Sequence, residues 1–342
     1  MLNIVKSVEL GKYHGEEAVY LRYGQYEAVL LPEIGGNLVA FRDIEQGYRF
    51  LHEPGKEEME SFKSRPIIHG IPILFPPNRY EDGRFPWDGV THTLPVNEPA
   101  TGNHLHGFVY NIPWQLEDYG ALPSESFVMV SITIDENHEV YASFPFCFRI
   151  ELRYGLSGNG LSQRVSVHNL GSRSMPCLLA FHTSVNAPFV DSSSARDYRM
   201  KLTIGERWEL NDRMLPTGQL QPLQVEEKAL QGTGVYPYWQ AMDNHYTALP
   251  QQGRNRMELT DEKLGVTLVY DVGTSYKKWM IWNNFATEGF FCPEPQVNLV
   301  NAPNVRLPAE QIGLFGLEPG EIWEETSRMY VKPAKESSHD GL

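Results

Sequence analysis

A glutamate between two prolines has the clearest setting for proton transfer in this sequence. Glu294 lies in the apolar stretch 290–296, directly between Pro293 and Pro295. Proline fixes the backbone torsion and carries no amide donor, so we expect this carboxylate to be held rigidly among aromatic neighbours. Removing water from around a carboxylate raises its pKa toward the range that is useful to a general base. We therefore predict that Glu294 is catalytic.

Two clusters contain histidines that could act beside a carboxylate. His182 follows an apolar run and precedes a polar loop, so we expect it at a strand end that faces a cleft. Ser184 is close to it, but the G-x-S-x-G pattern is absent, which argues against serine hydrolysis. His104 and His106 are two residues apart, so on a strand their rings would face one side and could bind a metal. Because residues 107–110 directly after His106 contain no acidic ligand, one buried and one surface histidine is the alternative.

An arginine and an aspartate are candidates for substrate binding. Arg79 lies in a segment rich in proline, glycine and aromatic residues, 66–114, and loop-rich segments of this kind often carry sites. Its guanidinium suits sugar hydroxyls or carboxylates, and a structural ion pair is the alternative. Asp243 follows an aromatic run, and taken alone it is a turn cap.

Short strands are the elements that must position these groups. The chain is 12% aromatic and contains 29 Gly and 24 Pro, which is typical of many short strands joined by turns. Residues 148–154 and 161–168 alternate between apolar and polar around a turn at 157–160, which predicts an antiparallel hairpin with one buried face. A second hairpin is predicted at 17–22 and 26–31. Further strands are expected at 126–134, 257–260, 265–270, 278–282 and 322–331.

The pattern as a whole predicts an all-β protein. Residues 56–63 are the only helix-like stretch of note, and no helix follows each strand, which argues against a doubly wound α/β fold. No repeat at a solenoid or propeller period is present. We predict one large antiparallel β-sandwich with few short helices, forming a single domain over residues 1–332. We expect the polar tail 333–342 to fray.

Composition limits the partners and the compartment. Lys+Arg total 29 and Asp+Glu total 43, so the net charge is 29 − 43 = −14, which argues against nucleic acid and anionic membranes as partners. The three widely spaced cysteines form neither a disulfide framework nor a zinc knuckle and fit a reducing compartment. The start of the chain has no signal-like apolar run, and no stretch approaches the length of a membrane span. We therefore expect a soluble, cytoplasmic protein.

Taken together, the clusters resemble the galactose mutarotase (aldose 1-epimerase) family over residues 17–331. That family's fold is a large antiparallel β-supersandwich with the sugar in a cleft on one sheet, and it needs no metal or cofactor. The resemblance therefore implies a monosaccharide substrate, and we expect a monomer or homodimer. It rests on motifs that occur in the family's order: Gly35-Gly36-Asn37, Asn78-Arg79-Tyr80, Gly83-Arg84-Phe85, Leu105-His106-Gly107, Phe181-His182-Thr183 with Asn186, Met242-Asp243 and Glu294-Pro295-Gln296.

The resemblance also implies roles for single residues. Glu294 matches the general base that takes the proton from the C1 hydroxyl, and His182 matches the general acid that protonates the ring oxygen. The ring then opens and closes again as the other anomer. Trp282 or Tyr80 could stack on the apolar face of the sugar. The implied substrate-binding residues are Arg79, Asp243, His106 and His104, and which of the two histidines contacts the sugar is left open.

Departures from the family pattern leave other functions open. Residues 65–72 and His106-Gly107-Phe108 resemble the related hexose-6-phosphate epimerases, in which an arginine two positions later holds the phosphate. Tyr110 occupies that position here, and Arg65, Arg84 or Lys277 could substitute. A non-catalytic carbohydrate-binding protein on the same fold is a further alternative, although binding alone requires neither the glutamate nor the histidine. A glycosidase would need a second carboxylate, and only Asp243 is available for nomination.

Overall fold

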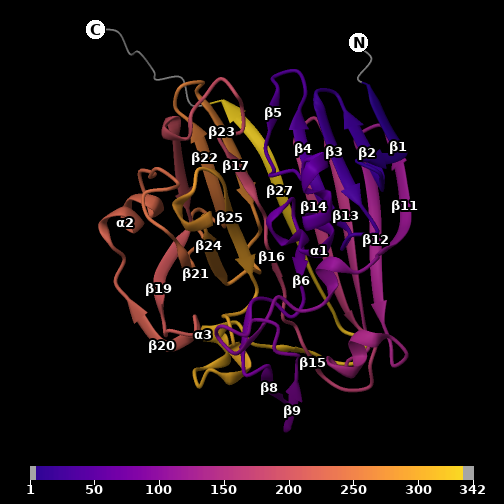
Figure 1. The fold of residues 1–342 in the computed structure, drawn as a ribbon, viewed down its shortest axis with the longest axis vertical. Coiled ribbons are helices and arrows are strands. Elements are labelled where there is room, and N and C mark those ends of the chain that lie inside the picture. Colours follow the sequence, from indigo (N-terminus) through magenta and orange to yellow (C-terminus); the bar gives the residue numbers. More distant parts are fainter. Residues whose placement is uncertain (1–4, 334–342) are drawn as a thin grey trace.

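The computed structural model describes residues 5–333 and contains three main antiparallel sheets (Figure 1). The N-terminal sheet follows sequence order and consists of β1 (Lys6–Tyr13), β2 (Glu16–Tyr23), β3 (Tyr26–Leu31), β4 (Asn37–Asp43) and β5 (Tyr48–Arg49). Its strands β1, β2 and β3 pack against the first strands of a second, larger sheet.

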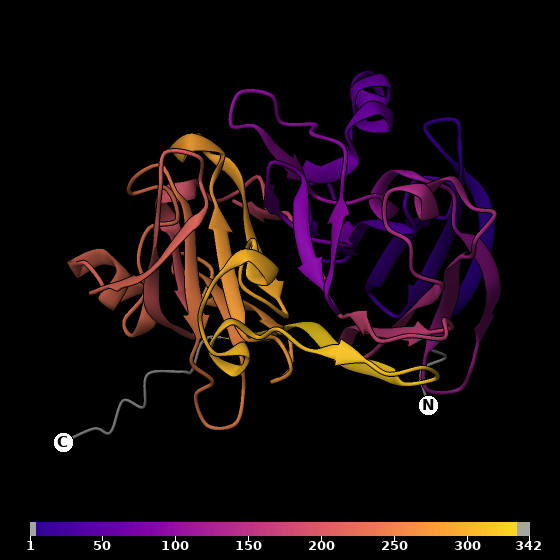
Figure 2. The same cartoon turned by 90° about the horizontal axis from the view of Figure 1, so that it is seen from below.

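The second sheet, called the long sheet here, has eight strands and joins distant parts of the chain. In spatial order it contains β11 (Gln115–Ala121), β12 (Ser126–Ile134), β13 (Phe148–Ser157), β14 (Gly160–Asn169), β27 (Ile322–Pro333), β23 (Val266–Asp271), β22 (Arg256–Asp261) and β18 (Tyr198–Leu202). Figure 2 shows β27, in yellow, passing from the orange half of the molecule toward the half that holds the indigo strands.

The third sheet, called the β25 sheet here, carries the candidate site. In spatial order it contains β20 (Pro216–Gln221), β19 (Ile204–Leu210), β21 (Asp243–Ala248), β24 (Lys278–Trp282), β25 (Gly289–Gln296), β16 (Ala180–Phe181) and β6 (Ile73–Leu74). An additional short strand, β17 (Val185–Ala187), also pairs with β25.

Small elements complete the described chain. The two-stranded ladders are β7 (Arg79–Glu81) with β10 (Asn103–Leu105), β8 (Arg84–Trp87) with β9 (Val90–Thr93), and β15 (Met175–Pro176) with β26 (Gly316–Leu317). The α-helices are α1 (Met59–Ser64), α2 (Val225–Gln231) and α3 (Ala309–Ile312). Single 3-10 turns occur at Lys56–Glu58, Pro66–Ile68, Val109–Asn111, Glu139–Ala142, Ala195–Asp197, Asn284–Ala286 and Ala302–Asn304.

The predicted strands are confirmed. The hairpin of β13 and β14 places Leu152 opposite Val165, and the predicted inner face of β14 is buried whereas Arg164 is exposed. The hairpin of β2 and β3 pairs Tyr23 with Tyr26. About 48% of the residues are in strands and 12% in helices, so the all-β, antiparallel fold class is also confirmed.

Of the α-helices in the described residues, α2 and α3 were not predicted from the sequence. The predicted stretch 56–63 forms a 3-10 turn followed by α1, but the expectation that it is the only helix of note is wrong, because α2 packs beside β18 and β19. Glu227 of α2 is fully buried whereas Val225 is exposed, so α2 lacks the continuous apolar inner face that usually marks a helix. Its carboxylate is paired with Arg207 and accepts a hydrogen bond from Tyr246.

Two further expectations concern the chain's ends and its surroundings. Pro333 ends β27, and residues 334–342 lie outside the described residues, so the frayed tail stays a prediction. Within residues 5–333, none of the helices has both the length and the apolar composition that crossing a membrane requires.

Candidate active site

A cavity of about 450 Å³ lies over the β25 sheet, where the predicted site residues come together. Its lining includes four of the six predicted side chains: Arg79, His106, His182 and Asp243. Glu294 lies beneath this lining with 0% of its surface exposed, and its Oε1 is 3.3 Å from Nε2 of His182. A larger cavity of about 930 Å³, between the N-terminal sheet and β17, contains none of the predicted residues.

Strand register explains why residues far apart in sequence meet at this cavity. Met280 of β24 lies opposite His245 on one side and opposite Glu294 on the other. Two residues away, Trp282 lies opposite Asp243. Because alternate residues of a strand point to the same face, these five side chains share one face of the sheet.

The two prolines beside Glu294 lie where β25 loses a partner strand. On the edge opposite β24, β25 pairs with β17 as far as Phe291 and with β16 only at Gln296. The chain between β16 and β17 instead donates backbone hydrogen bonds to Pro72 and Gly70. Proline is tolerated in a strand where no ladder bond is required, so the gap accommodates both prolines and holds the carboxylate between them.

Burial shifts the two groups of the Glu294–His182 pair toward their uncharged forms. Loss of water raises the pKa of Glu294 well above its ordinary value, Asp243 raises it further, and Arg79 partly opposes the shift. Loss of water also lowers the pKa of His182 to about 4. Since both shifts favour the neutral forms, the proton that the pair shares resides on the glutamate.

His106 provides a second uncharged imidazole in the cavity. Its ring lies 5.5 Å from that of His182 at an angle of 88°. Burial, followed by the charges of His182 and Arg79, lowers the pKa of His106 well below its ordinary value. Its Nδ1 is buried and has no hydrogen-bond partner among residues 5–333, so it is free to bond a ligand hydroxyl.

His104 occupies a different position from the one expected. β10 ends at Leu105 and His106 has a φ of +71°, so the two histidines do not alternate along one strand as the sequence suggested. Nδ1 of His104 lies 2.7 Å from the carbonyl oxygen of Pro95, and its Nε2 accepts a hydrogen bond from the amide of Gly107. His104 is fully buried and does not line this cavity, and its two hydrogen bonds hold the loop, so its contact with a substrate stays a prediction.

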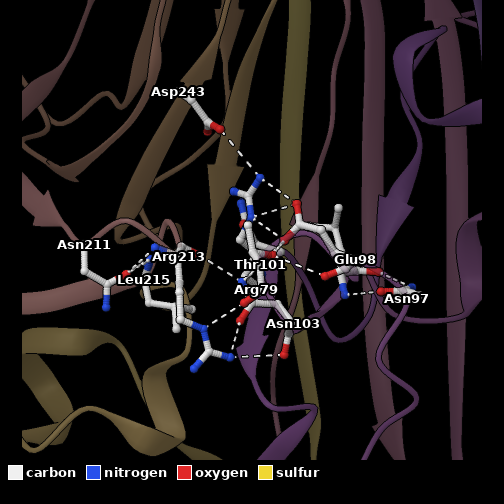
Figure 3. A network of polar contacts seen from close by, with 12 residues as sticks. Arg79, Asn97, Glu98, Thr101, Asn103, Asn211, Arg213, Leu215 and Asp243 are labelled. Atoms are coloured by element: carbon white, nitrogen blue, oxygen red, sulfur yellow. Dashed lines mark hydrogen bonds and ion pairs between the residues drawn. The ribbon is translucent and has the colours of Figure 1, made fainter.

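Arg79 is oriented by two carboxylates, as Figure 3 shows. Its Nε lies 3.0 Å from Oε2 of Glu98, its Nη2 lies 3.1 Å from Oε1, and the same Nη2 lies 3.6 Å from Oδ2 of Asp243. Burial alone would raise the pKa of Glu98, but hydrogen bonds from Arg79 and Thr101 lower it below its ordinary value. Arg79 is therefore both a structural ion pair and a cavity residue, which combines the two alternatives drawn from the sequence.

A second arginine fastens the loop that carries Glu98. Arg213 donates hydrogen bonds to the carbonyl oxygens of Thr101 and Gly102 (Figure 3). Asn103 donates to Glu98 from the same loop. The fork of Arg79 is therefore fixed in direction by a network that reaches the connection between β19 and β20.

The two aromatic residues expected to stack on a sugar, Trp282 and Tyr80, lie in different surroundings. Trp282 lines the cavity, with its ring 6.2 Å from that of His182. Tyr80 is fully buried in the core, so the expectation that it stacks on a sugar is wrong. Cys292 is fully buried, and burial raises the pKa of its thiol.

Several cavity residues were not identified from the sequence. Glu98 carries no local motif, because its partner Arg79 is 19 residues away on another element. Of the three cations nominated for phosphate, Arg65 lines the cavity, and Arg84 and Lys277 do not. The remaining lining residues, to which the sequence analysis assigned no role, are Ile67, Ile68, Asn78, Leu105, Met280, Asn284 and Phe285.

Comparison with known proteins places this geometry in context. The family model for aldose 1-epimerase matches residues 17–330. A galactose mutarotase-like protein from Clostridium acetobutylicum is 31% identical, with a TM-score of 0.92 over 95% of this chain and 98% of that one. The galactose 1-epimerase of Lactobacillus acidophilus shares the fold, with a TM-score of 0.69 at 14% identity over 97% and 98% of the two chains.

One curated relative is more distant. The uncharacterized protein YihR of Escherichia coli is 24% identical over 203 residues, and this match covers 59% of each chain.

Proposed function

The chain belongs to the aldose 1-epimerase family, and we propose that it interconverts the α and β anomers of a free aldose through proton transfer by Glu294 and His182. The single observation that carries the proposal is the 3.3 Å approach of these two groups at the bottom of the cavity. A carboxylate and an imidazole so close together can remove one proton and supply another across a single sugar ring.

The proposed reaction conserves protons on the pair. Glu294, as the carboxylate, takes the proton from the C1 hydroxyl while His182, as the imidazolium, protonates the ring oxygen. The bond between C1 and the ring oxygen breaks and C1 becomes the aldehyde carbon. After rotation about C1–C2, both protons return and the ring closes as the other anomer.

Burial favours the arrangement with the shared proton on Glu294, so the reactive arrangement requires its transfer to His182. The two arrangements differ only in which of two atoms 3.3 Å apart carries that proton. A sugar hydroxyl that donates a hydrogen bond to Glu294 favours its charged form. Substrate binding would thus favour the ionised pair, and Arg79, whose charge already lowers the pKa of Glu294, would act in the same direction.

The remaining cavity residues suit a polyhydroxylated ligand. We propose that Arg79, Asp243 and His106 bind ring hydroxyls and that Trp282 lies against an apolar ring face. Asp243 Oδ1 and His106 Nδ1 are both buried without a hydrogen-bond partner among the described residues, as expected of groups that await a ligand.

Anomer exchange measured by NMR tests the proposal. Purified protein would be added to pure anomers of glucose, galactose and other aldoses. Glu294→Gln keeps the side-chain shape and His182→Asn keeps a polar group but removes the ring, and each should lower kcat by about 10²- to 10⁴-fold. Glu324→Gln, at an exposed position of β27, is the matched control. If the wild type binds sugars without accelerating exchange, the non-catalytic binding function would be the correct one.

A hexose-6-phosphate is the second candidate substrate, because of one observation. Arg79 is neutralised by carboxylates, whereas Arg65 at the cavity makes no salt bridge within residues 5–333. A free guanidinium suits a phosphate. Exchange of glucose 6-phosphate that exceeds exchange of glucose, and that is lost in Arg65→Gln, would move the assignment to this substrate.

A further inference from the structure

The motif Glu294-Pro295-Gln296 contains a second polar residue that the proposed chemistry does not use. Gln296 ends β25 and is fully buried. It comes two residues after Glu294, so the two side chains share one face of the strand. A buried amide is costly unless its polar atoms find partners, so the contacts of Gln296 indicate what this residue does.

The side-chain amide of Gln296 lies against the carboxyl group of Glu294. Its Nε2 donates a hydrogen bond to Oε2 of Glu294 over 3.5 Å. The amide oxygen, Oε1, has no hydrogen-bond partner among residues 5–333. Turning the amide over would bring this oxygen to the carboxylate, and two acceptors in contact repel each other. The charged form of Glu294, which the proposed reaction requires, therefore needs the donor end of the amide to face it.

The two oxygens of Glu294 thus have different neighbours. Oε1 lies 3.3 Å from Nε2 of His182, and Oε2 accepts the hydrogen bond from Gln296. A donor favours negative charge on the oxygen that it contacts, so it disfavours a proton on that oxygen. A proton on the carboxyl group accordingly belongs on Oε1, opposite the histidine nitrogen that must receive it.

The orientation of this carboxyl group depends on Gln296. Within the described part of the chain, no other group donates a hydrogen bond to Glu294. Lys278 lies opposite Gln296 in the register of β24 and β25, but its ammonium group donates to the carbonyl oxygen of Gln311. The lysine therefore does not replace the amide as a partner of the carboxylate.

The charged groups around Glu294 act on it through space. Arg79, on β7, favours the carboxylate, and Asp243, on β21, opposes it. Burial favours the uncharged forms of the other titratable side chains on this side of the sheet, which are His106, His182, His245 and Cys292. A charge that makes no contact acts on both oxygens of the carboxyl group, whereas a hydrogen bond distinguishes one from the other.

We propose that Gln296 positions the base of the proposed reaction: its amide holds Oε2 of Glu294, so that Oε1 faces His182 and the shared proton passes directly between them. This inference rests on the proposed function. In the step itself the O–H bond at Oε1 breaks, the proton binds Nε2 of His182, and the carboxylate keeps the electron pair. The hydrogen bond from Gln296 then stabilises the new negative charge at Oε2.

Loss of this hydrogen bond should lower the population of the reactive arrangement. The bond lowers the pKa of Glu294, so its removal raises that pKa and holds the proton on the carboxyl group more firmly. The fraction of the protein with the proton on His182 falls by the same factor, because both equilibria begin with release of the proton from Glu294. A rise of about one pH unit in the pKa corresponds to a roughly tenfold fall in that fraction.

The pH dependence of anomer exchange tests the inference. Gln296→Met keeps the length of the side chain and removes the donor. Between the two limbs of the pH profile, its kcat/KM should fall about tenfold, and the alkaline limb, where Glu294 loses the shared proton, should move up by about one pH unit. Above that limb the two profiles should meet, because Glu294 is then ionised in both proteins. The acid limb, which His182 sets, should not move.

Two results would overturn the inference. A fall in kcat/KM by the same factor at every pH would mean that the substitution only disturbs the packing. An unchanged profile would mean that the hydrogen bond does not act on Glu294. If Gln296→Met does not fold, Gln296→Asn serves instead, because its amide ends one methylene short of the carboxylate and should give the same shift.

A second buried glutamine provides the matched control. Gln163 is 3% exposed, and its Oε1 also lacks a partner among residues 5–333, but its amide donates to Tyr154 in the long sheet. Gln163→Met therefore removes a buried amide of the same kind away from the cavity. It should leave both limbs of the profile and the kcat/KM between them unchanged.

A stability measurement separates failure of this inference from failure of the proposed function. The difference in free energy of unfolding between a protein and its Glu294→Gln variant stops changing with pH once the folded Glu294 ionises. With Gln296→Met in both proteins, this levelling should occur about one pH unit higher than without it. Absence of anomer exchange with every sugar would refute the proposed function. In that case a higher levelling pH would still support the contact of Gln296 with Glu294, and an equal one would overturn it.

Discussion

The proton shared by Glu294 and His182 should leave a signature in the pH dependence of stability. In the folded protein the pair holds one proton, because burial raises the pKa of Glu294 well above 4.5 and lowers that of His182 from 6.5 to about 4. In the unfolded chain, at a pH between the ordinary pKa values of 4.5 and 6.5, the two side chains also hold one proton, but it is on the histidine. Between pH 4.5 and 6.5, therefore, the pair makes no contribution to the pH dependence of the free energy of unfolding.

Outside that interval the two states bind different numbers of protons. Above pH 6.5 the unfolded histidine is deprotonated, and the raised pKa of Glu294 lets the folded protein hold a proton that the unfolded chain has lost, so the free energy of unfolding falls as pH rises until the folded glutamate ionises. The limiting slope is about 1.4 kcal/mol per pH unit. Below pH 4.5 the unfolded chain binds the extra proton, and stability falls again toward acid until His182 is protonated near pH 4.

Glu294→Gln isolates the contribution of the carboxyl group. In this variant His182 remains, and its lowered pKa makes stability rise with pH up to about 6.5 and then level off. Relative to wild type, the free energy of unfolding should increase steadily above pH 4.5, by up to about 2.8 kcal/mol between about pH 5.5 and 7.5. The inactive variant should thus gain stability over wild type as pH rises, as expected when a catalytic group is buried at a cost to the fold.

Urea unfolding of wild type and Glu294→Gln at several pH values measures this difference. Glu324→Gln should differ from wild type by less than about 0.5 kcal/mol throughout, because the side chain is exposed. If the difference between Glu294→Gln and wild type stays constant with pH, Glu294 ionises in the folded protein as it does in the unfolded chain. The inference of a raised pKa would then be refuted.

Three further predictions concern the residues that shape the cavity. Glu98→Gln removes one partner of a largely buried ion pair, so the free energy of unfolding should fall by about 1–3 kcal/mol in urea; an unchanged midpoint would mean that the pair contributes nothing. His104→Phe leaves the amide of Gly107 without an acceptor and should cost about 1–3 kcal/mol by thermal unfolding, and His104→Gln should cost less. Gly107→Ala would place a methyl group 2.3 Å from the carbonyl oxygen of Phe75 at a φ of +70°, and should lower Tm more than Gly89→Ala, which has a similar φ and open space. Equal effects of the two alanines would show that φ, not the contact, sets the loss.

The strands could be predicted because the alternation of apolar and polar residues within each strand shows which of its faces is buried. β12 matches the expected range 126–134, and β13 and β14 alternate between buried and exposed positions because only one face meets the core. Helix α2 could not be predicted in this way. Its buried Glu227 is matched by Arg207 and Tyr246 on other strands, and no local pattern contains that pairing.

In the candidate site, too, residues with a local sequence signal could be predicted, and contacts between residues distant in the sequence could not. Glu294 could be singled out because its setting, an apolar run with two prolines, is local. The contact of Arg79 with Glu98 depends on a loop held by Arg213, so no local sequence pattern could indicate it. His104 was misplaced because the alternation rule assumed a continuous strand, and β10 ends before His106.

The position of β27 has a consequence for how the chain acquires its structure during synthesis. β27 comes after every strand that it pairs with, yet it lies inside the long sheet, between β14 and β23. Until it emerges from the ribosome, two long strand edges remain open, and open edges invite pairing with other chains. We therefore expect nascent chains that stop before Ile322 to aggregate or to depend on chaperones, since neither half of the long sheet can close without this strand.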